Sequence, residues 1–368
     1  MPKKILIVSS SFYPMNSPRS SRTTELAKEM SRQGHEVTVL TPKIPEHSDF
    51  EKKYELTIKN LGKQTWKPAE LKGSSVSLLL RRAINRFSNL LLEYPDIQLM
   101  GMVEKALKKE EQNYDLLISI AVPHAIHWGV AKVWKKGSDQ NPAKVWVSDC
   151  GDPYMGNPLR KKFFYFKYME KWFCRKADYL TVPVKEAIKG YYKEFHHKIK
   201  VIPQGFNIDS IDYKRQYKGN RVPTFVYAGV FYKDIRDPKT FLDYLATLDV
   251  DFKFIIYTKK KKLVTPYEKR LKGKLIVKDY IPREDLLLQM SQADFLINFE
   301  NNTSIQSPSK LIDYALVGRP VLSINSNGIL DIELINQFLN GDYSNALQVG
   351  NIEQYDIKNV AKEFIKLI

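Results

Sequence analysis

The stretch ILIVSSSFYPMNSPRSSRTTELAKEMSRQGHEVTVLT, residues 5–41, predicts a strand, a helix and a second strand. It begins with an apolar run, 5–9, that is typical of a buried strand, and continues into a polar turn rich in Ser, Pro and Asn. Leu26 and Met30 then recur at helical spacing, and Gly34 stands where a glycine commonly ends a helix. A strand–helix–strand unit implies a parallel sheet whose faces are covered by helices.

The same alternation continues through the chain. Apolar runs that are typical of buried strands follow at 115–122, 144–150, 177–183, 200–206, 224–230, 252–258, 274–280, 293–299 and 320–324. Residues 205–220 interrupt the series with a polar, irregular stretch, as a linker would. We therefore expect an α/β protein built from two successive domains.

The composition is that of a folded globular protein. The 368 residues suffice for two domains, and contents of 43% apolar and 12% aromatic residues are typical of a folded globular protein. Cys150 and Cys174 have neither the spacing of a disulfide framework nor that of a metal site. No stretch approaches the ~20 apolar residues that cross a bilayer, so we expect a cytoplasmic protein.

The net charge of +17 indicates a polyanionic partner, namely nucleic acid, an anionic membrane surface or a phosphorylated substrate, or else a solvated basic surface without a partner. No nucleic-acid-binding module is recognisable, so we expect no nucleic acid. The run LRRAINRFSNLLL (80–92) would place apolar residues on one helical face and arginines on the other, which suits either an anionic bilayer or a surface helix packed on the core. The basic aromatic run at 161–176 leaves the same two alternatives, and we expect Lys259–Lys262 to be a solvated loop.

The segment SPSKLIDYALVG, residues 307–318, predicts a helix whose first turn suits a phosphate group. Pro308 fits the first helical position, and free backbone N–H groups there lie beside the Ser309 hydroxyl and the Lys310 ammonium. One turn later, the Asp313 carboxylate could accept two hydroxyl hydrogen bonds from a ribose. The alternative is an ordinary capped helix with Lys310 and Asp313 simply exposed.

This segment resembles the donor-binding signature P-S-K-L-x-E-Y-x-A-x-G-x-P-V of the GT-B glycosyltransferases of family 4. Asp313 stands where Glu is usual, and Ile305 replaces a second Glu expected eight residues earlier. DCGDPY (149–154) is similar to the element D-x-R-D-P-W of related enzymes, with Gly151 in place of Arg. Further similar elements are the opening 5–42, KADYLTVPVKEAIKGY (176–191), KVIPQGFNID (200–209) and YAGVFYKDIRDP (227–238).

The resemblance implies the GT-B architecture, in which two Rossmann-like domains with parallel sheets face a central cleft. It implies an acceptor-binding domain, a donor-binding domain and a C-terminal segment that packs back on the first domain, and we place them at 1–206, 207–340 and 341–368. The implied reaction is retaining transfer of a hexosyl group from a nucleotide sugar, UDP-sugar before GDP-sugar, to a saccharide or a lipid-linked saccharide. The setting would be lipopolysaccharide or capsule synthesis at the inner face of the cell membrane, without a metal or other cofactor.

Site residues follow from the resemblance and from their places after expected strands. The donor would contact Gly229, Lys233, Arg236, Ile281, Pro308, Ser309, Lys310, Leu311 and Asp313. The acceptor or diphosphate side would use Ser17, Arg19 and Arg22, and the catalytic candidates are His127, Asp149, Arg236 and Lys310. Two of these have structural alternatives, since Arg236 could pair with Asp234 or Asp237 and His127 could be a satisfied buried histidine.

Two other functions are compatible with the same fold. A sugar-nucleotide epimerase, such as a UDP-sugar 2-epimerase, would make a new sugar nucleotide without an acceptor. A non-catalytic scaffold protein is also open, since the glutamate expected at Ile305 is missing.

Overall fold

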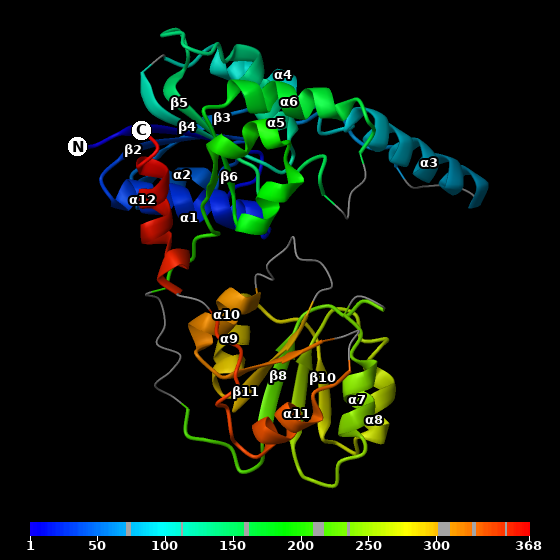
Figure 1. Cartoon of the computed structure of the whole chain (residues 1–368). Helices are drawn as coiled ribbons and strands as arrows, with labels where there is room; N and C mark the ends of the chain where they lie inside the picture. Colours follow the sequence, from blue (N-terminus) through cyan, green and yellow to red (C-terminus); the bar gives the residue numbers. More distant parts are fainter. Residues whose placement is uncertain are drawn as a thin grey trace. The chain divides into compact units, whose positions relative to one another are not determined.

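The computed structural model describes residues 1–70, 75–111, 113–157, 162–208, 217–233, 236–300, 310–325, 329–349 and 352–368 (Figure 1). The chain forms two compact units. Unit 1 comprises Met1–Asn207 and Gln354–Ile368, and unit 2 comprises Ile208–Glu353. Each unit has its own sheet and its own core, as expected for an α/β protein with two domains.

Unit 1 contains a seven-stranded sheet in the order β3-β2-β1-β4-β5-β6-β7, and every pair of neighbours is parallel. The strands are β1 (Lys4–Val8), β2 (Glu36–Thr41), β3 (Thr57–Asn60), β4 (Tyr114–Ile120), β5 (Ala143–Asp149), β6 (Tyr179–Val182) and β7 (Ile199–Val201). The strand order reverses between β1 and β4. In open parallel sheets this reversal leaves a crevice at the carboxyl ends of the strands, where ligands bind.

Helices cover both faces of this sheet because alternate residues of each strand point to opposite sides. Ile5 and Ile7 of β1 belong to a core shared with α1 (Pro18–Arg32), α2 (His47–Tyr54) and α12 (Ile357–Ile365). Leu6 and Val8 belong to a second core shared with α4 (Gln98–Leu107), α5 (Ala125–Val133) and α6 (Phe166–Lys176). The remaining helices of the unit are α3 (Ser75–Leu92) and two short 3-10 helices, Lys185–Gly190 and Lys193–Lys198.

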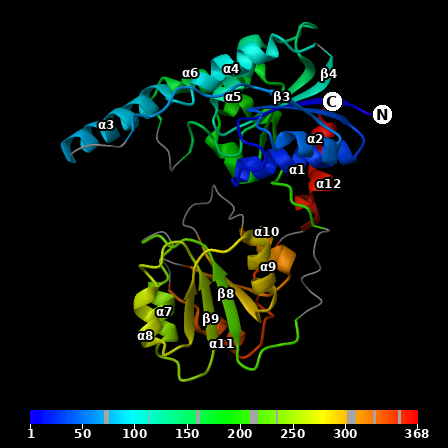
Figure 2. The same ribbon diagram turned by 180° about the vertical axis from the view of Figure 1, so that it is seen from behind.

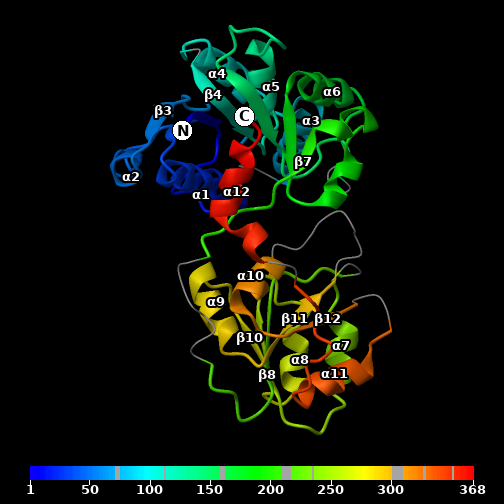
Figure 3. The same cartoon turned by 60° about the vertical axis from the view of Figure 1, so that its left-hand side comes forward.

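The end of the chain belongs to unit 1. The backbone N–H of Phe206 donates to the carbonyl of Tyr355, and that of Ile357 donates to the carbonyl of Phe206. These two bonds form an isolated parallel bridge between Phe206 and Asp356. Helix α12 then packs against α1 (Figure 3). The return begins at Gln354 rather than at Gly341, because Tyr343 packs on Phe338 within the core of unit 2.

Unit 2 contains a five-stranded parallel sheet in the order β10-β9-β8-β11-β12. Its strands are β8 (Thr224–Ala228), β9 (Lys253–Tyr257), β10 (Leu275–Lys278), β11 (Phe295–Phe299) and β12 (Val321–Ile324). Its helices are α7 (Lys239–Leu245), α8 (Thr265–Arg270), α9 (Arg283–Ser291), α10 (Lys310–Val317) and α11 (Ile332–Leu339), and a 3-10 helix (Ile352–Tyr355) leads out of the unit.

A stack of phenylalanines fills the centre of unit 2. The ring of Phe225 lies 4.7 Å from that of Phe254 and 4.7 Å from that of Phe295, one on each neighbouring strand. On the other face of the sheet, α9 and α10 pack on each other and on the strands. Tyr314 of α10 is buried and donates a hydrogen bond of 2.7 Å to the carbonyl of Ile297 in β11, which fixes the position of α10 on the sheet.

None of the described helices combines the length and the apolar character that a membrane-spanning helix needs.

Candidate active site

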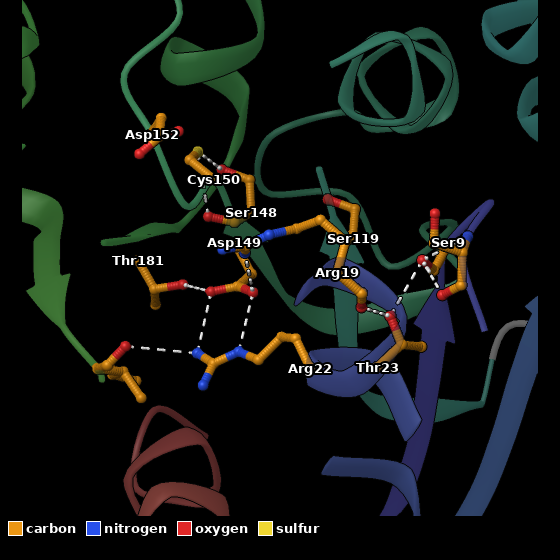
Figure 4. A network of polar contacts seen from close by, with 12 residues as sticks. Ser9, Arg19, Arg22, Thr23, Ser119, Ser148, Asp149, Cys150, Asp152 and Thr181 are labelled. Atoms are coloured by element: carbon orange, nitrogen blue, oxygen red, sulfur yellow. Dashed lines mark hydrogen bonds and ion pairs between the residues drawn. The ribbon is translucent and has the colours of Figure 1, made fainter. Parts of the chain in front are cut away.

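In unit 1, the N-terminal part of α1 and the carboxyl end of β5 lie together, one strand away from the reversal of the strand order. Ser17 caps α1 by accepting a hydrogen bond of 3.1 Å from the backbone N–H of Ser20, so the first turn of the helix starts at a defined point. Arg19 and Arg22 follow on this turn and the next, and both point to Asp149 at the end of β5 (Figure 4).

Arg22 and Asp149 form a buried, bidentate ion pair. The Nε and Nη2 atoms of Arg22 each lie 3.1 Å from one carboxylate oxygen, and Thr181 of β6 donates a third bond of 2.7 Å to Oδ1 (Figure 4). Burial by itself would raise the pKa of Asp149, but the charges of Arg22 and Arg19 and the hydrogen bonds from Arg22 and Thr181 hold it below the ordinary value. The carboxylate therefore stays ionised, and its bonds are internal.

Arg22 has a structural role in this arrangement. Its side chain is 2% exposed, it also donates to the carbonyls of Ile202 and Pro203, and it lies 5.1 Å from the ring centre of Phe364 in α12. This differs from the expectation that Arg22 serves the acceptor or diphosphate side and that Asp149 is a catalytic residue. The reason is burial, which two complementary charges tolerate only when they satisfy each other.

Arg19 is the cation of this group that reaches the surface. Its side chain is 24% exposed, and its Nη1 lies 3.8 Å from Oδ2 of Asp149. The guanidinium covers Gly151, where an added Cβ would lie 2.8 Å from Cζ of Arg19, and the φ of +69° also favours glycine. Burial lowers the pKa of Arg19, and Asp149 acts in the opposite direction. The space that a side chain at 151 would fill is thus occupied by an arginine from α1.

His127 lies on α5 and is fully buried, in contrast to a histidine that would contact a ligand. Its Nδ1 is 2.8 Å from Oγ of Ser119, which also accepts a hydrogen bond of 2.8 Å from Nε1 of Trp146. Burial lowers the pKa of His127 to about 3, although Asp149 acts in the opposite direction, so the ring is neutral. Among the described residues its Nε2 has no hydrogen-bond partner.

In unit 2, the loop after β8 carries three of the expected donor residues. Gly229 has a φ of +150°, which glycine adopts readily. Tyr232 and Arg236 then exchange two backbone hydrogen bonds, of 3.2 and 2.8 Å, and Lys233, which follows Tyr232, is exposed. The guanidinium of Arg236 donates to the carbonyl of Val230. Asp234, one of its two expected alternative partners, lies outside the described residues.

Helix α10 carries the second group of expected donor residues. Pro308, Ser309 and Ile305 lie outside the described residues, and of Lys310 and Leu311 the structure describes only their place in the first turn of α10.

Asp313 is bound by a partner that the sequence analysis missed. Arg283, at the start of α9, donates from Nε at 2.9 Å and from Nη2 at 2.6 Å, and both bonds end on Oδ1. Oδ2 has no hydrogen bond within the described part of the chain. Burial raises the pKa of Asp313, and Arg283 opposes this effect. The signal for Arg283 was a basic residue shortly after the run 274–280, at the carboxyl edge of the sheet.

The model of the family described as Glycosyltransferase Family 4 matches residues 20–210, more than half of the sequence. The chain belongs to Glycosyltransferase Family 4. It is therefore a glycosyltransferase, as the resemblance of its motifs implied. No curated protein matches the sequence.

Solved structures show that this family 4 glycosyltransferase has the GT-B fold. A glycosyltransferase from Rickettsia africae is 12% identical with a TM-score of 0.60, over 100% of this chain and 97% of the other. TarM is 10% identical with a TM-score of 0.61, over 100% and 99% of the two chains. HepE from Anabaena, solved in complex with UDP, is 12% identical with a TM-score of 0.59, over 99% and 98%. At these identities the likeness shows the fold alone.

A hollow in unit 2 of the glycosyltransferase has a volume of about 360 Å³. Its lining is Tyr257, Lys278, Asp279, Ile281, Asp285, Leu288 and Gln289, so it includes residues on both sides of Arg283 in the sequence. The size is at the lower end of the range for small-molecule sites. Ile281 is the only expected donor residue in this lining, and it stands two positions before Arg283. Among the described residues, no group of three or more His, Cys, Asp or Glu side chains is arranged to hold a metal ion.

Proposed function

We propose that this glycosyltransferase transfers a hexosyl group from a UDP-sugar, with GDP-sugars as the next choice, and with retention of the anomeric configuration. The acceptor is a saccharide or a lipid-linked saccharide in lipopolysaccharide or capsule synthesis, and the enzyme works at the inner face of the cell membrane. HepE was solved with UDP-glucose, and WaaB is a lipopolysaccharide outer core galactosyltransferase. Both proteins share the fold. The ligand of the first belongs to the donor class proposed here, and the name of the second places it in lipopolysaccharide synthesis.

The observation that carries the proposal is the single-sided Arg283–Asp313 pair. A carboxylate with one oxygen held by an arginine, and the other without a hydrogen bond among the described residues, is a ready acceptor for the two hydroxyl groups of a ribose. The side chain of Asp313 is shorter than that of the usual Glu. Arg283, at the start of α9, compensates for this by holding the carboxylate in one position. The hollow beside Ile281 would then take the base.

The first turn of α10 would bind the diphosphate. The backbone N–H groups in the first turn of a helix have no partner within the helix, and together with Lys310 and the preceding Ser309 they would favour negative charge at this end. Arg236 and Lys233 on the loop after β8 would neutralise the charge that develops as the sugar leaves. In retaining transfer on one face of the sugar, the departing phosphate itself takes the proton of the acceptor hydroxyl, so no separate general base is required.

On unit 1, we assign the acceptor side to Arg19. Its guanidinium reaches the surface at the carboxyl end of β5, where it would bind an anionic or hydroxyl group of the acceptor. Ser17 acts by capping the helix that carries it, and Asp149 acts by holding it. His127 is a positioning residue in this scheme, because it is buried and neutral.

A thermal-shift panel of UDP, GDP, ADP and CMP tests the donor assignment. We expect stabilisation by UDP in the wild type and a smaller shift in Asp313→Ala, because ligand binding to the native state raises its melting temperature. Asp249→Ala, an exposed aspartate of the same unit, is the matched control and should keep the full shift. Equal shifts in the wild type and in Asp313→Ala would disprove the ribose assignment. Conversion of a UDP-sugar into a second sugar nucleotide, without an acceptor product, would favour an epimerase.

A further inference from the structure

Helix α3 is bound to the preceding segment through part of its polar face and has its apolar face exposed. The guanidinium of Arg81 donates a bond of 3.0 Å to the carbonyl of Glu70, and Asn85 exchanges two bonds, of 2.7 and 2.8 Å, with the backbone of Ala69. A surface helix of a globular protein normally has the opposite arrangement, with its apolar stripe on the core. Of the two alternatives that the sequence left open for this helix, packing of its apolar side on the core is therefore not the one that the structure shows.

The exposed face consists of four large side chains at helical spacing. Leu80, Ile84, Phe87 and Leu91 are between 37% and 62% exposed. Residues 3, 4 and 7 positions apart lie on one side of a helix, so the four form a continuous apolar stripe. A stripe of this kind on a folded protein marks a surface that another body covers.

The helix is held to its unit at its C-terminal end. Glu93 pairs with Lys162, and the hydroxyl of Tyr165 donates to the carbonyl of Leu91. Figures 1 and 2 show α3 running away from the sheet of unit 1, beyond α4 and α6. The stripe is thus presented at the periphery of the unit. Next to the attachment point, Phe164 and Tyr168 are also exposed.

Positive charge surrounds the stripe. Arg82 and Arg86 are exposed on α3, and residues 75–92 contain no Asp or Glu. Lys167 lies 5.0 Å from the ring centre of the exposed Tyr168. An apolar stripe flanked by arginines and aromatic rings is the pattern of a helix that lies in the plane of an anionic bilayer surface.

We propose that α3 is a membrane-docking helix that inserts Leu80, Ile84, Phe87 and Leu91 into the surface of an anionic bilayer. Arg82 and Arg86 would remain at the level of the lipid phosphates. Charge favours this partner over a second copy of the chain, because two such helices would bring like charges together without an acid to neutralise them. This inference rests on the proposed function in one respect, namely that a lipid-linked acceptor gives the enzyme a reason to bind a membrane.

Vesicle co-sedimentation of the full chain tests the proposal. We expect binding to vesicles that contain phosphatidylglycerol to exceed binding to neutral phosphatidylcholine vesicles about tenfold at low salt, and high salt to reduce the difference. Ile84→Ser/Phe87→Ser should lower the partition coefficient about tenfold or more. Val250→Ser/Ile332→Ser, which removes comparably exposed apolar side chains of unit 2, should leave it unchanged. Arg82→Gln/Arg86→Gln should remove most of the preference for the anionic lipid.

A second readout does not depend on variants that lose binding. In Phe87→Trp, a brominated lipid should quench more fluorescence than in the wild type, because the new indole would lie among the acyl chains. Equal quenching, equal binding to neutral and anionic vesicles, or unchanged binding by Ile84→Ser/Phe87→Ser would overturn the proposal. A concentration-dependent dimer without vesicle binding would assign the stripe to a second copy instead. The nucleotide thermal shift of the same variants reports separately on the donor site, so the two proposals fail independently.

Discussion

Replacing Arg22 by methionine should destabilise unit 1 strongly. The side chain of Asp149 is 3% exposed, so removal of the arginine that holds both its oxygens leaves a buried charge with Thr181 and the more distant Arg19. Breaking one side of a buried ion pair lowers the free energy of unfolding by about 3–5 kcal/mol. Lys108→Met, which breaks an exposed pair with Glu104, should lower it by only about 0.5 kcal/mol.

Urea unfolding followed by tryptophan fluorescence measures this change in unit 1 alone, because all five tryptophans lie in residues 1–207. Adding Asp149→Asn to Arg22→Met should recover part of the loss, because the buried charge is then gone. A loss below about 1 kcal/mol in Arg22→Met, or a double variant as unstable as the sum of the single ones, would refute the reasoning.

The effect should also depend on pH in a defined direction. In the wild type the folded pKa of Asp149 lies below its unfolded value, so the carboxylate stabilises the fold above about pH 4 and this stability is lost as the pH falls further. Burial is already the largest single effect on the pKa of Asp149, and without Arg22 the remaining charges and hydrogen bonds no longer outweigh it, so the folded pKa moves upwards. Stability of Arg22→Met should then fall as the pH rises from about 4, so the difference from the wild type is larger at pH 7 than at pH 4.

Three further results are expected. Arg283→Ala should weaken UDP binding about tenfold in calorimetry, since Asp313 loses the group that holds it, and an unchanged affinity would separate Arg283 from the donor site. In the wild type, His127 has a folded pKa of about 3 and, below about pH 6, binds its proton only in the unfolded state. The free energy of unfolding therefore falls by up to about 1.4 kcal/mol per pH unit as the pH drops below about 6. His127→Gln should not show this fall. The exposed His197→Gln is its control, and the same slope in both variants would contradict this account. Gly151→Ala should displace Arg19 and lower the free energy of unfolding by about 1 kcal/mol. The KM for the acceptor should rise and the KM for the donor should stay unchanged. A change in the donor KM alone would argue against Arg19 as an acceptor residue.

The sequence by itself determined the secondary structure and the class of fold. The runs 115–122 and 144–150 correspond to β4 (Tyr114–Ile120) and β5 (Ala143–Asp149), because a buried parallel strand is a local run of apolar residues. Local spacing also located Asp149 at the end of its strand. The strand β3 (Thr57–Asn60) was missed, because its four residues carry no apolar run.

Tertiary structure decided what each of these side chains does. Arg22 and Asp149 are 127 positions apart and Arg283 and Asp313 are 30 apart, and no local pattern records which charges meet across a sheet. The sequence of α3 predicted an amphipathic helix. Only the contacts of Ala69 and Glu70 with its polar side show that the apolar side is exposed. Periodicity depends on neighbours along the chain, whereas burial and charge pairing depend on neighbours in space, and those exist only once the strands have taken their order.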